Sequence, residues 1–128
     1  MVKLDTNDRG FTIKIRLKEN PLRPNERFHF EVTNEFTRKM EIWESQEEVF
    51  TDGILTCQFN NNKTFNANTF GILRIYAALE EVVLISKRLL KQVKLHFIDT
   101  AAGSQHQPTS ENYLEPNAKS GANEFMTL

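Results

Sequence analysis

The stretch Phe11-Thr12-Ile13-Lys14-Ile15-Arg16-Leu17-Lys18 alternates apolar and polar residues without a break. Successive side chains of a β-strand point to opposite faces of a sheet, so this period of two predicts a half-buried strand. Its apolar side chains would then face a core while its polar ones face solvent. We expect the other strands of the domain to pair with or pack against this strand.

Three further segments downstream carry strand signals: residues 27–33, 40–44 and 54–59. Their expected inward-facing side chains are Phe28, Phe30, Val32, Met40, Ile42, Leu55, Cys57 and Phe59. The Asp52-Gly53 pair between the last two segments is a strong turn signal. The connections are too short for parallel crossovers, so the sequence predicts an antiparallel sheet.

The period changes after Gly71. The residues Ile72, Tyr76, Leu79, Val83, Ser86, Leu90 and Val93 are spaced alternately by four and three. This spacing is typical of an amphipathic helix, which we place at residues 78–92 after a strand that ends near Ala77. The alternative is two more strands, because this region is rich in β-branched residues. Residues 93–98 alternate again and predict a closing strand.

The composition changes again after Asp99, where Ala, Gly, Ser, Gln, Asn, Pro and Thr dominate. Such a segment buries too little apolar surface to offset the entropy of ordering. We therefore predict one globular domain at residues 1–99 and a disordered tail at residues 100–128. The predicted fold class is α+β: a β-rich, mostly antiparallel sandwich- or barrel-like domain with one packed helix near 78–92.

Residues 20–34 resemble a segment of immunoglobulin-like sandwich proteins. In those proteins a proline-containing turn precedes an aromatic-rich strand that ends in Asn, as Asn20-Pro21, Phe28-His29-Phe30 and Asn34 do here. The resemblance implies a β-sandwich. The helical stripe after Gly71 departs from that pattern.

The net charge and the cysteine content limit the partners and the cellular compartment that we expect for the protein. The formal net charge is −1, which favours neither nucleic acid nor an anionic membrane surface. A single cysteine, Cys57, excludes an intrachain disulfide and fits a reducing compartment. No leader-like segment and no apolar run of membrane-spanning length is present, so we expect an intracellular protein, cytoplasmic or nuclear, without membrane contact.

No group of residues in the sequence has the pattern of a catalytic, metal or cofactor site. Cys57 alternates with core residues, as expected of a buried, unreactive thiol. His29 and His96 are both expected on an outer face, and two histidines lack the third ligand of a zinc site. No phosphate-binding glycine motif is present. We therefore predict a protein that is not an enzyme and carries no cofactor.

Trp43 lies beside an acidic run, and the alternation of its strand predicts an outward side chain. Tryptophan on the outer face of a sheet is enriched at protein interfaces. We therefore predict a partner-binding site formed by Trp43, Glu44, Glu47 and Glu48. The alternative is that another element covers the Trp43 side chain.

A second candidate surface is basic and comprises Lys87, Arg88, Lys91 and Lys94. On the predicted helix and the strand after it, these residues could follow phosphates or contact the acidic site of another copy. In the tail, the segment around Tyr113 and Pro116 is similar to a phosphotyrosine docking motif. The predicted function is a non-catalytic adaptor or scaffold that assembles an intracellular complex, with possible homo-oligomers; the alternative is a nucleic-acid-associated subunit.

Overall fold

The computed structural model describes residues 1–80 and 85–101 of the chain, and these residues form strands connected by turns and loops. The strands are β1 (Val2–Asp5), β2 (Gly10–Arg16), β3 (Arg27–Asn34), β4 (Met40–Trp43), β5 (Ser45–Thr51), β6 (Ile54–Asn60), β7 (Thr69–Glu80) and β8 (Ile85–Ile98). No helix that could cross a membrane occurs in this described part of the chain.

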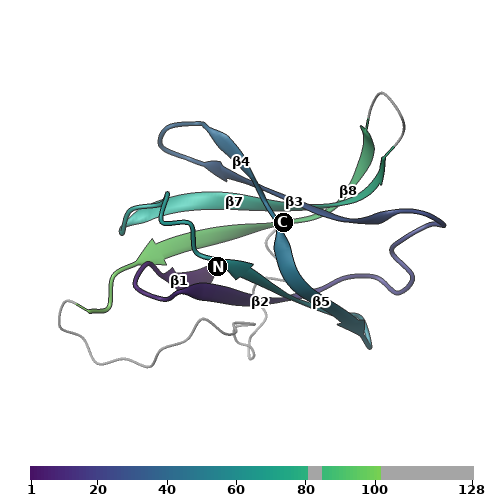
Figure 1. Ribbon diagram of the computed structural model, residues 1–128, viewed down its shortest axis with the longest axis horizontal. Coiled ribbons are helices and arrows are strands. Elements are labelled where there is room, and N and C mark those ends of the chain that lie inside the picture. Colours follow the sequence, from purple (N-terminus) through teal and green to yellow (C-terminus); the bar gives the residue numbers. More distant parts are fainter. Residues whose placement is uncertain (81–84, 102–128) are drawn as a thin grey trace.

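The strands form two sheets that pack face to face (Figure 1). The larger sheet has the order β1-β8-β7-β3-β4 and the smaller sheet the order β2-β6-β5. Neighbouring strands are antiparallel, apart from β1, which runs parallel to β8. The prediction of a β-rich, mostly antiparallel domain is therefore confirmed.

This strand order is that of an immunoglobulin-type sandwich, in which the chain changes sheets after the first, second, fourth and sixth strands. Cys57, the lone cysteine, lies on β6 and is free, so no disulfide links the two sheets. A topology shared by many unrelated proteins carries no function by itself.

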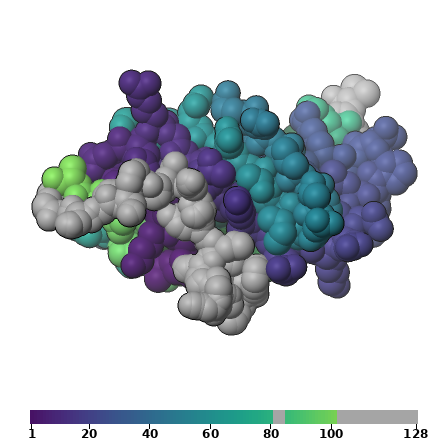
Figure 2. Space-filling view, turned by 90° about the horizontal axis from the view of Figure 1, so that it is seen from below, coloured from purple at the N-terminus to yellow at the C-terminus, as the bar shows by residue number. Residues whose placement is uncertain are grey.

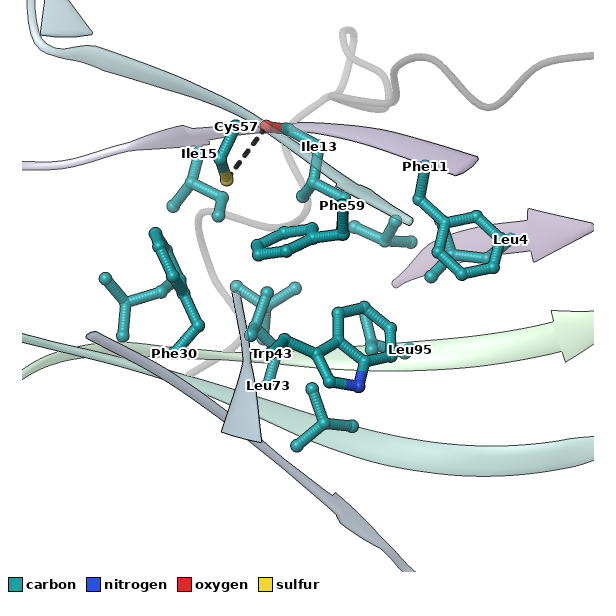
Figure 3. Close-up of a cluster of buried hydrophobic side chains, with 14 of the residues drawn as sticks. Leu4, Phe11, Ile13, Ile15, Phe30, Trp43, Cys57, Phe59, Leu73 and Leu95 are labelled. Atoms are coloured by element: carbon teal, nitrogen blue, oxygen red, sulfur yellow. Dashed lines mark hydrogen bonds between the residues drawn. The ribbon is translucent and has the colours of Figure 1, made fainter. Parts of the chain in front are cut away.

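The core lies between the two sheets and is rich in aromatic side chains (Figure 3). Phe11, Ile13 and Ile15 face it from β2, and Leu55, Cys57 and Phe59 face it from β6, as the alternation predicts. Phe30 meets Phe59 edge to face, with ring centroids 5.0 Å apart. The Cys57 thiol donates to the carbonyl oxygen of Ile13 at 3.5 Å.

The predicted helix at residues 78–92 is wrong. The described residues on either side of positions 81–84 belong to β7 and β8, which pair antiparallel from Thr69–Phe97 to Glu80–Ile85. In this hairpin, Leu73, Ile75, Val93 and Leu95 are buried, following a period of two. A register shift opposite Ile75 and Tyr76 skips Leu90 of β8, so Leu90 and Val93, three positions apart, both pack against the core, as two residues of a helical stripe would.

The predicted outward orientation of Trp43 is also wrong. The Trp43 side chain is 5% exposed and lies in the core (Figure 3). Met40 and Ile42 instead face solvent. The turn between β3 and β4 causes this difference, because it places Met40 opposite Thr33 and Glu41 opposite Val32. Directly paired residues share a face of the sheet. Val32 faces the core, so its partner Glu41 lies on the inner side of the sheet and Met40 does not.

Most of the predicted tail lies outside the described residues, including Tyr113 and Pro116. Thr100 and Ala101, its first two residues, are described. The Thr100 hydroxyl donates to the Asp5 carboxylate, which also accepts hydrogen bonds from the Asn7 backbone and side-chain nitrogens at 2.9 Å. These contacts tie the end of β8 to the end of β1.

Candidate protein-interaction site

The candidate site lies along one open side of the sandwich, where β4 is the last strand of the larger sheet and β5 the last strand of the smaller one. Glu44 is the single residue between these two strands, so the chain passes directly from one sheet to the other (Figure 1). This crossover brings Trp43, Glu44 and Glu48 of the predicted binding site to the same side of the molecule.

Three large apolar side chains are exposed on the β3–β4 hairpin: Phe36, Met40 and Ile42, with exposed fractions of 84%, 50% and 53%. Met40 and Ile42 lie on the outer face of β4, and Phe36 lies in the turn. Apolar side chains gathered on an edge strand are a feature that soluble proteins usually avoid. We name this group the β4 apolar edge.

A well-defined turn holds the β4 apolar edge in place. The Asn34 carboxamide oxygen accepts hydrogen bonds from the backbone nitrogens of Phe36 and Thr37, at 2.8 and 3.0 Å. Arg38 has a φ of 69°, and its backbone nitrogen donates to the Asn34 carbonyl oxygen at 2.7 Å. A short polar side chain that bonds to the backbone in this way stabilises the turn without support from the core.

The backbone of β4 offers hydrogen-bonding groups at the open edge. The Asn34 nitrogen donates to the Lys39 carbonyl oxygen at 2.9 Å, which fixes that pair as a bonded pair. Bonded pairs alternate along an antiparallel ladder, so Glu41 and Trp43 direct their backbone groups toward β3. Met40 and Ile42 therefore direct theirs toward the open edge.

Two concavities flank the crossover. One of about 250 Å³ is lined by residues of β3 together with Ile42, Trp43, Glu44 and Glu48. The other, of about 200 Å³, lies between the crossover and β6 and is also lined by Ile42, Trp43 and Glu44. The crossover therefore projects between two hollows that could receive partner side chains.

The acidic residues of the predicted site do not all face the same way. Glu48 pairs with Cys57, and Glu47 pairs with Gln58, so the two glutamates lie on opposite faces of the smaller sheet. Burial raises the pKa of Glu48, and the charge of Arg27 partly opposes that rise.

Figure 2 views the molecule from below, where the middle of the chain (teal) borders the N-terminal segment (purple).

Trp43 supports the candidate site from the inner, core-facing side of β4. Its indole Nε1 donates to Glu41 Oε1 at 3.1 Å. The Glu41 carboxylate also accepts hydrogen bonds from Asn62 Nδ2 and Thr64 Oγ1, each at 2.9 Å. These bonds tie the inner side of β4 to the connection between β6 and β7.

The four basic residues of the second candidate surface lie on two sides of β8. Lys87 and Lys94 are on the outer face, where they pair with Glu31 and Glu35. Arg88 points to the β2–β3 connection, where it bonds to Glu26 Oε1 at 2.5 Å and the Pro21 carbonyl at 3.1 Å. The Lys91 ammonium lies 3.3 Å from the Arg16 carbonyl. They form no shared basic surface.

A charged cluster lies at the centre of the outer face of the larger sheet. The Glu31 carboxylate accepts a hydrogen bond from Lys87 and lies 2.9 Å from His29 Nε2. Burial alone would raise the pKa of Glu31, but its bonds to Lys87 and His29 outweigh that effect and lower it. His96 lies on the same face, stacked on Phe70, and no group of three metal-ligating side chains occurs among the described residues.

The alternation of residues 40–44 predicts Met40 and Ile42 in the core, and it gives Phe36 no role. The observed arrangement follows from the pairing of Asn34 with Lys39 in the structure, which determines which residues of β4 share a face with Val32. No protein-family model, no curated protein and no solved structure matches this chain.

Proposed function

We propose that the chain is a non-catalytic protein-interaction module, an adaptor or scaffold subunit that assembles a complex inside the cell. The observation that carries the proposal is the β4 apolar edge, which combines exposed apolar side chains with open backbone hydrogen-bonding groups. Addition of a partner strand to a sheet edge uses both features, because the backbone supplies affinity and the side chains supply specificity.

The acidic residues beside the edge indicate the partner's chemistry. Glu44 is exposed at the crossover, and Glu47 and Glu48 follow it on β5. An extended protein segment with apolar side chains over Met40 and Ile42 and a basic side chain near Glu44 would complement this site. Such rim charges act mainly on association rate and specificity, while the apolar contacts supply most of the affinity.

The proposal is tested by affinity purification of the full chain from native cells, followed by mass spectrometry of the proteins that co-purify. The variant M40K/I42K removes the apolar contacts at exposed positions, where folding stability should change by only about 0.5 kcal/mol. The matched control is L89K, because Leu89 is exposed to 51% on β8, away from β4.

We expect a direct partner to be lost from the M40K/I42K variant and retained by the L89K variant, with both variants folded by circular dichroism. The purified partner should then bind the M40K/I42K variant at least tenfold more weakly than the original chain. Equal capture and equal affinity for a folded M40K/I42K variant would refute the proposal.

A further inference from the structure

We propose that the partner on the β4 apolar edge is a second copy of this chain, paired antiparallel through the two β4 strands about a twofold axis. This inference rests on the proposed function and names its partner. The two larger sheets would then join into one continuous sheet across the dimer. A twofold contact uses the same surface on both copies, so that surface must be complementary to itself.

The backbone of β4 determines the register of such a pair. Only Met40 and Ile42 direct their backbone groups to the open edge, so these residues must form the bonded pairs between the copies. The register that uses both residues is centred on Glu41. It places Met40 of one copy opposite Ile42 of the other, twice in the dimer.

The side chains complement one another in this register. Met40 and Ile42 are both about half exposed on the outer face, so the dimer gathers four apolar side chains into one cluster there. Cross-strand apolar pairs of this kind stabilise antiparallel sheets, and each pair would cover part of the Met40 and Ile42 surface that the monomer exposes.

The charges at the two ends of β4 are opposite in sign. Arg38 and Lys39 precede the strand, and Glu44 follows it. The register centred on Glu41 brings Arg38, in the turn before β4 of one copy, to the end of β4 where Glu44 of the other copy lies, and the twofold axis repeats the pair. A parallel arrangement would instead align like charges, so the charge pattern selects the antiparallel dimer.

The two Glu41 residues meet at the axis, on the opposite face from the apolar cluster. Each carboxylate is already held by the Trp43 indole, the Asn62 carboxamide and the Thr64 hydroxyl of its own copy. These neutral donors solvate each carboxylate and hold it within its own sandwich. The axis can therefore accommodate both residues.

The interface is small, because β4 has only four residues. Stable complexes bury about 1,200–2,000 Å² in total, so a smaller contact predicts a weak dimer in exchange with the monomer. Sedimentation velocity of the full chain over a range of concentrations should show the average mass rising from monomer toward dimer.

The decisive experiment is a charge swap at the ends of β4, measured by the same sedimentation series on folded proteins. R38E and E44R should each raise the dimer dissociation constant at least fivefold, because each places like charges opposite one another twice. The double variant R38E/E44R restores the pairs and should recover the original dissociation constant. I42K should abolish the dimer, and L89K should leave it unchanged.

A full chain that stays monomeric at every concentration would overturn the dimer. So would a dimer that persists in I42K, or a charge swap that does not restore association. In any of these cases the proposed function stands if the M40K/I42K variant still loses a different protein in the affinity purification. If that variant loses no partner and the chain is monomeric, both proposals fail.

Discussion

The indole ring of Trp43 on β4 stacks on the phenyl ring of Phe11 on β2, with centroids 5.8 Å apart and an interplanar angle of 20°. The contact joins the edge strand of the larger sheet to the smaller sheet. Trp43 also contacts Phe59, Phe65 and Phe97, at centroid distances of 5.2, 6.2 and 6.4 Å. The indole is therefore the meeting point of aromatic rings from both sheets, which fixes β4 to the core.

Truncation of Trp43 should destabilise the domain strongly. W43A removes the stacking contacts and leaves a cavity, and it deprives Glu41 of one hydrogen-bond donor. Removal of a buried tryptophan typically costs about 3–5 kcal/mol of the free energy of unfolding. Urea denaturation followed by circular dichroism measures this loss. The matched control on the same strand is M40A, which should change the free energy by about 0.5 kcal/mol.

Equal midpoints and slopes of W43A and M40A in urea would contradict the assignment of the two faces of β4. W43F distinguishes packing from hydrogen bonding, because it keeps most of the ring contacts and loses the donor to Glu41. Its expected stability lies between those of W43A and the original chain.

A second pair of substitutions tests the core predicted by simple alternation. Phe30 is 2% exposed and contacts Phe59, whereas Lys14 is exposed on the outer face of β2. F30A should cost about 3–5 kcal/mol, a large share of the stability of a small domain. K14A should stay within about 0.5 kcal/mol. Thermal unfolding of both variants measures the difference, and similar melting temperatures would contradict the face assignment.

The sequence was sufficient to predict strands whose two faces differ clearly in polarity. Phe11, Ile13 and Ile15 alternate with Thr12 and Lys14, and only one orientation of that strand buries all of the apolar residues. The Asp52-Gly53 turn was equally predictable. Both residues have positive φ, 55° and 79°, as the tight turn between β5 and β6 requires.

The sequence was ambiguous where both faces of a strand carry large apolar side chains. In β4, Met40 and Ile42 lie on one face and Glu41 and Trp43 on the other, so alternation alone does not identify the buried face. The choice depends on the length of the turn and the positive φ of Arg38, which are set by hydrogen bonds to Asn34. The β7–β8 hairpin was missed for a related reason, because its register shift interrupts the alternation.

Cys57 should be unreactive in the folded protein. The thiol is fully buried, and burial together with the charge of Glu48 raises its pKa, so the nucleophilic thiolate is scarce. Labelling with a thiol-reactive disulfide reagent at pH 8 should be slow in buffer and fast in denaturing urea. Rapid labelling under native conditions, at a rate independent of urea, would show that the β6 core face is open to solvent.

The Glu31 cluster should make folding stability depend on pH. The pKa of Glu31 is lowered from its ordinary value of 4.5, since the bonds from Lys87 and His29 outweigh burial. A carboxyl with a depressed pKa binds more protons in the unfolded state, so its stabilising contribution is present above pH 4.5 and is lost as the pH falls through the folded value. Glu31→Gln removes this titration.

The expected result is that the difference in unfolding free energy between the original chain and E31Q is larger at pH 7 than at pH 3. Comparing the two proteins cancels the contribution of Asp5, whose pKa is also lowered because bonds from Thr100 and Asn7 exceed the effect of burial.

The control is E80Q, because both side chains of the Arg27–Glu80 ion pair are exposed, at 67% and 59%, and such pairs contribute little to stability. Urea titrations at pH 3, 5 and 7 measure all three proteins. Parallel pH curves for E31Q and the original chain would show that the buried Glu31 carboxylate is not stabilised by Lys87 and His29.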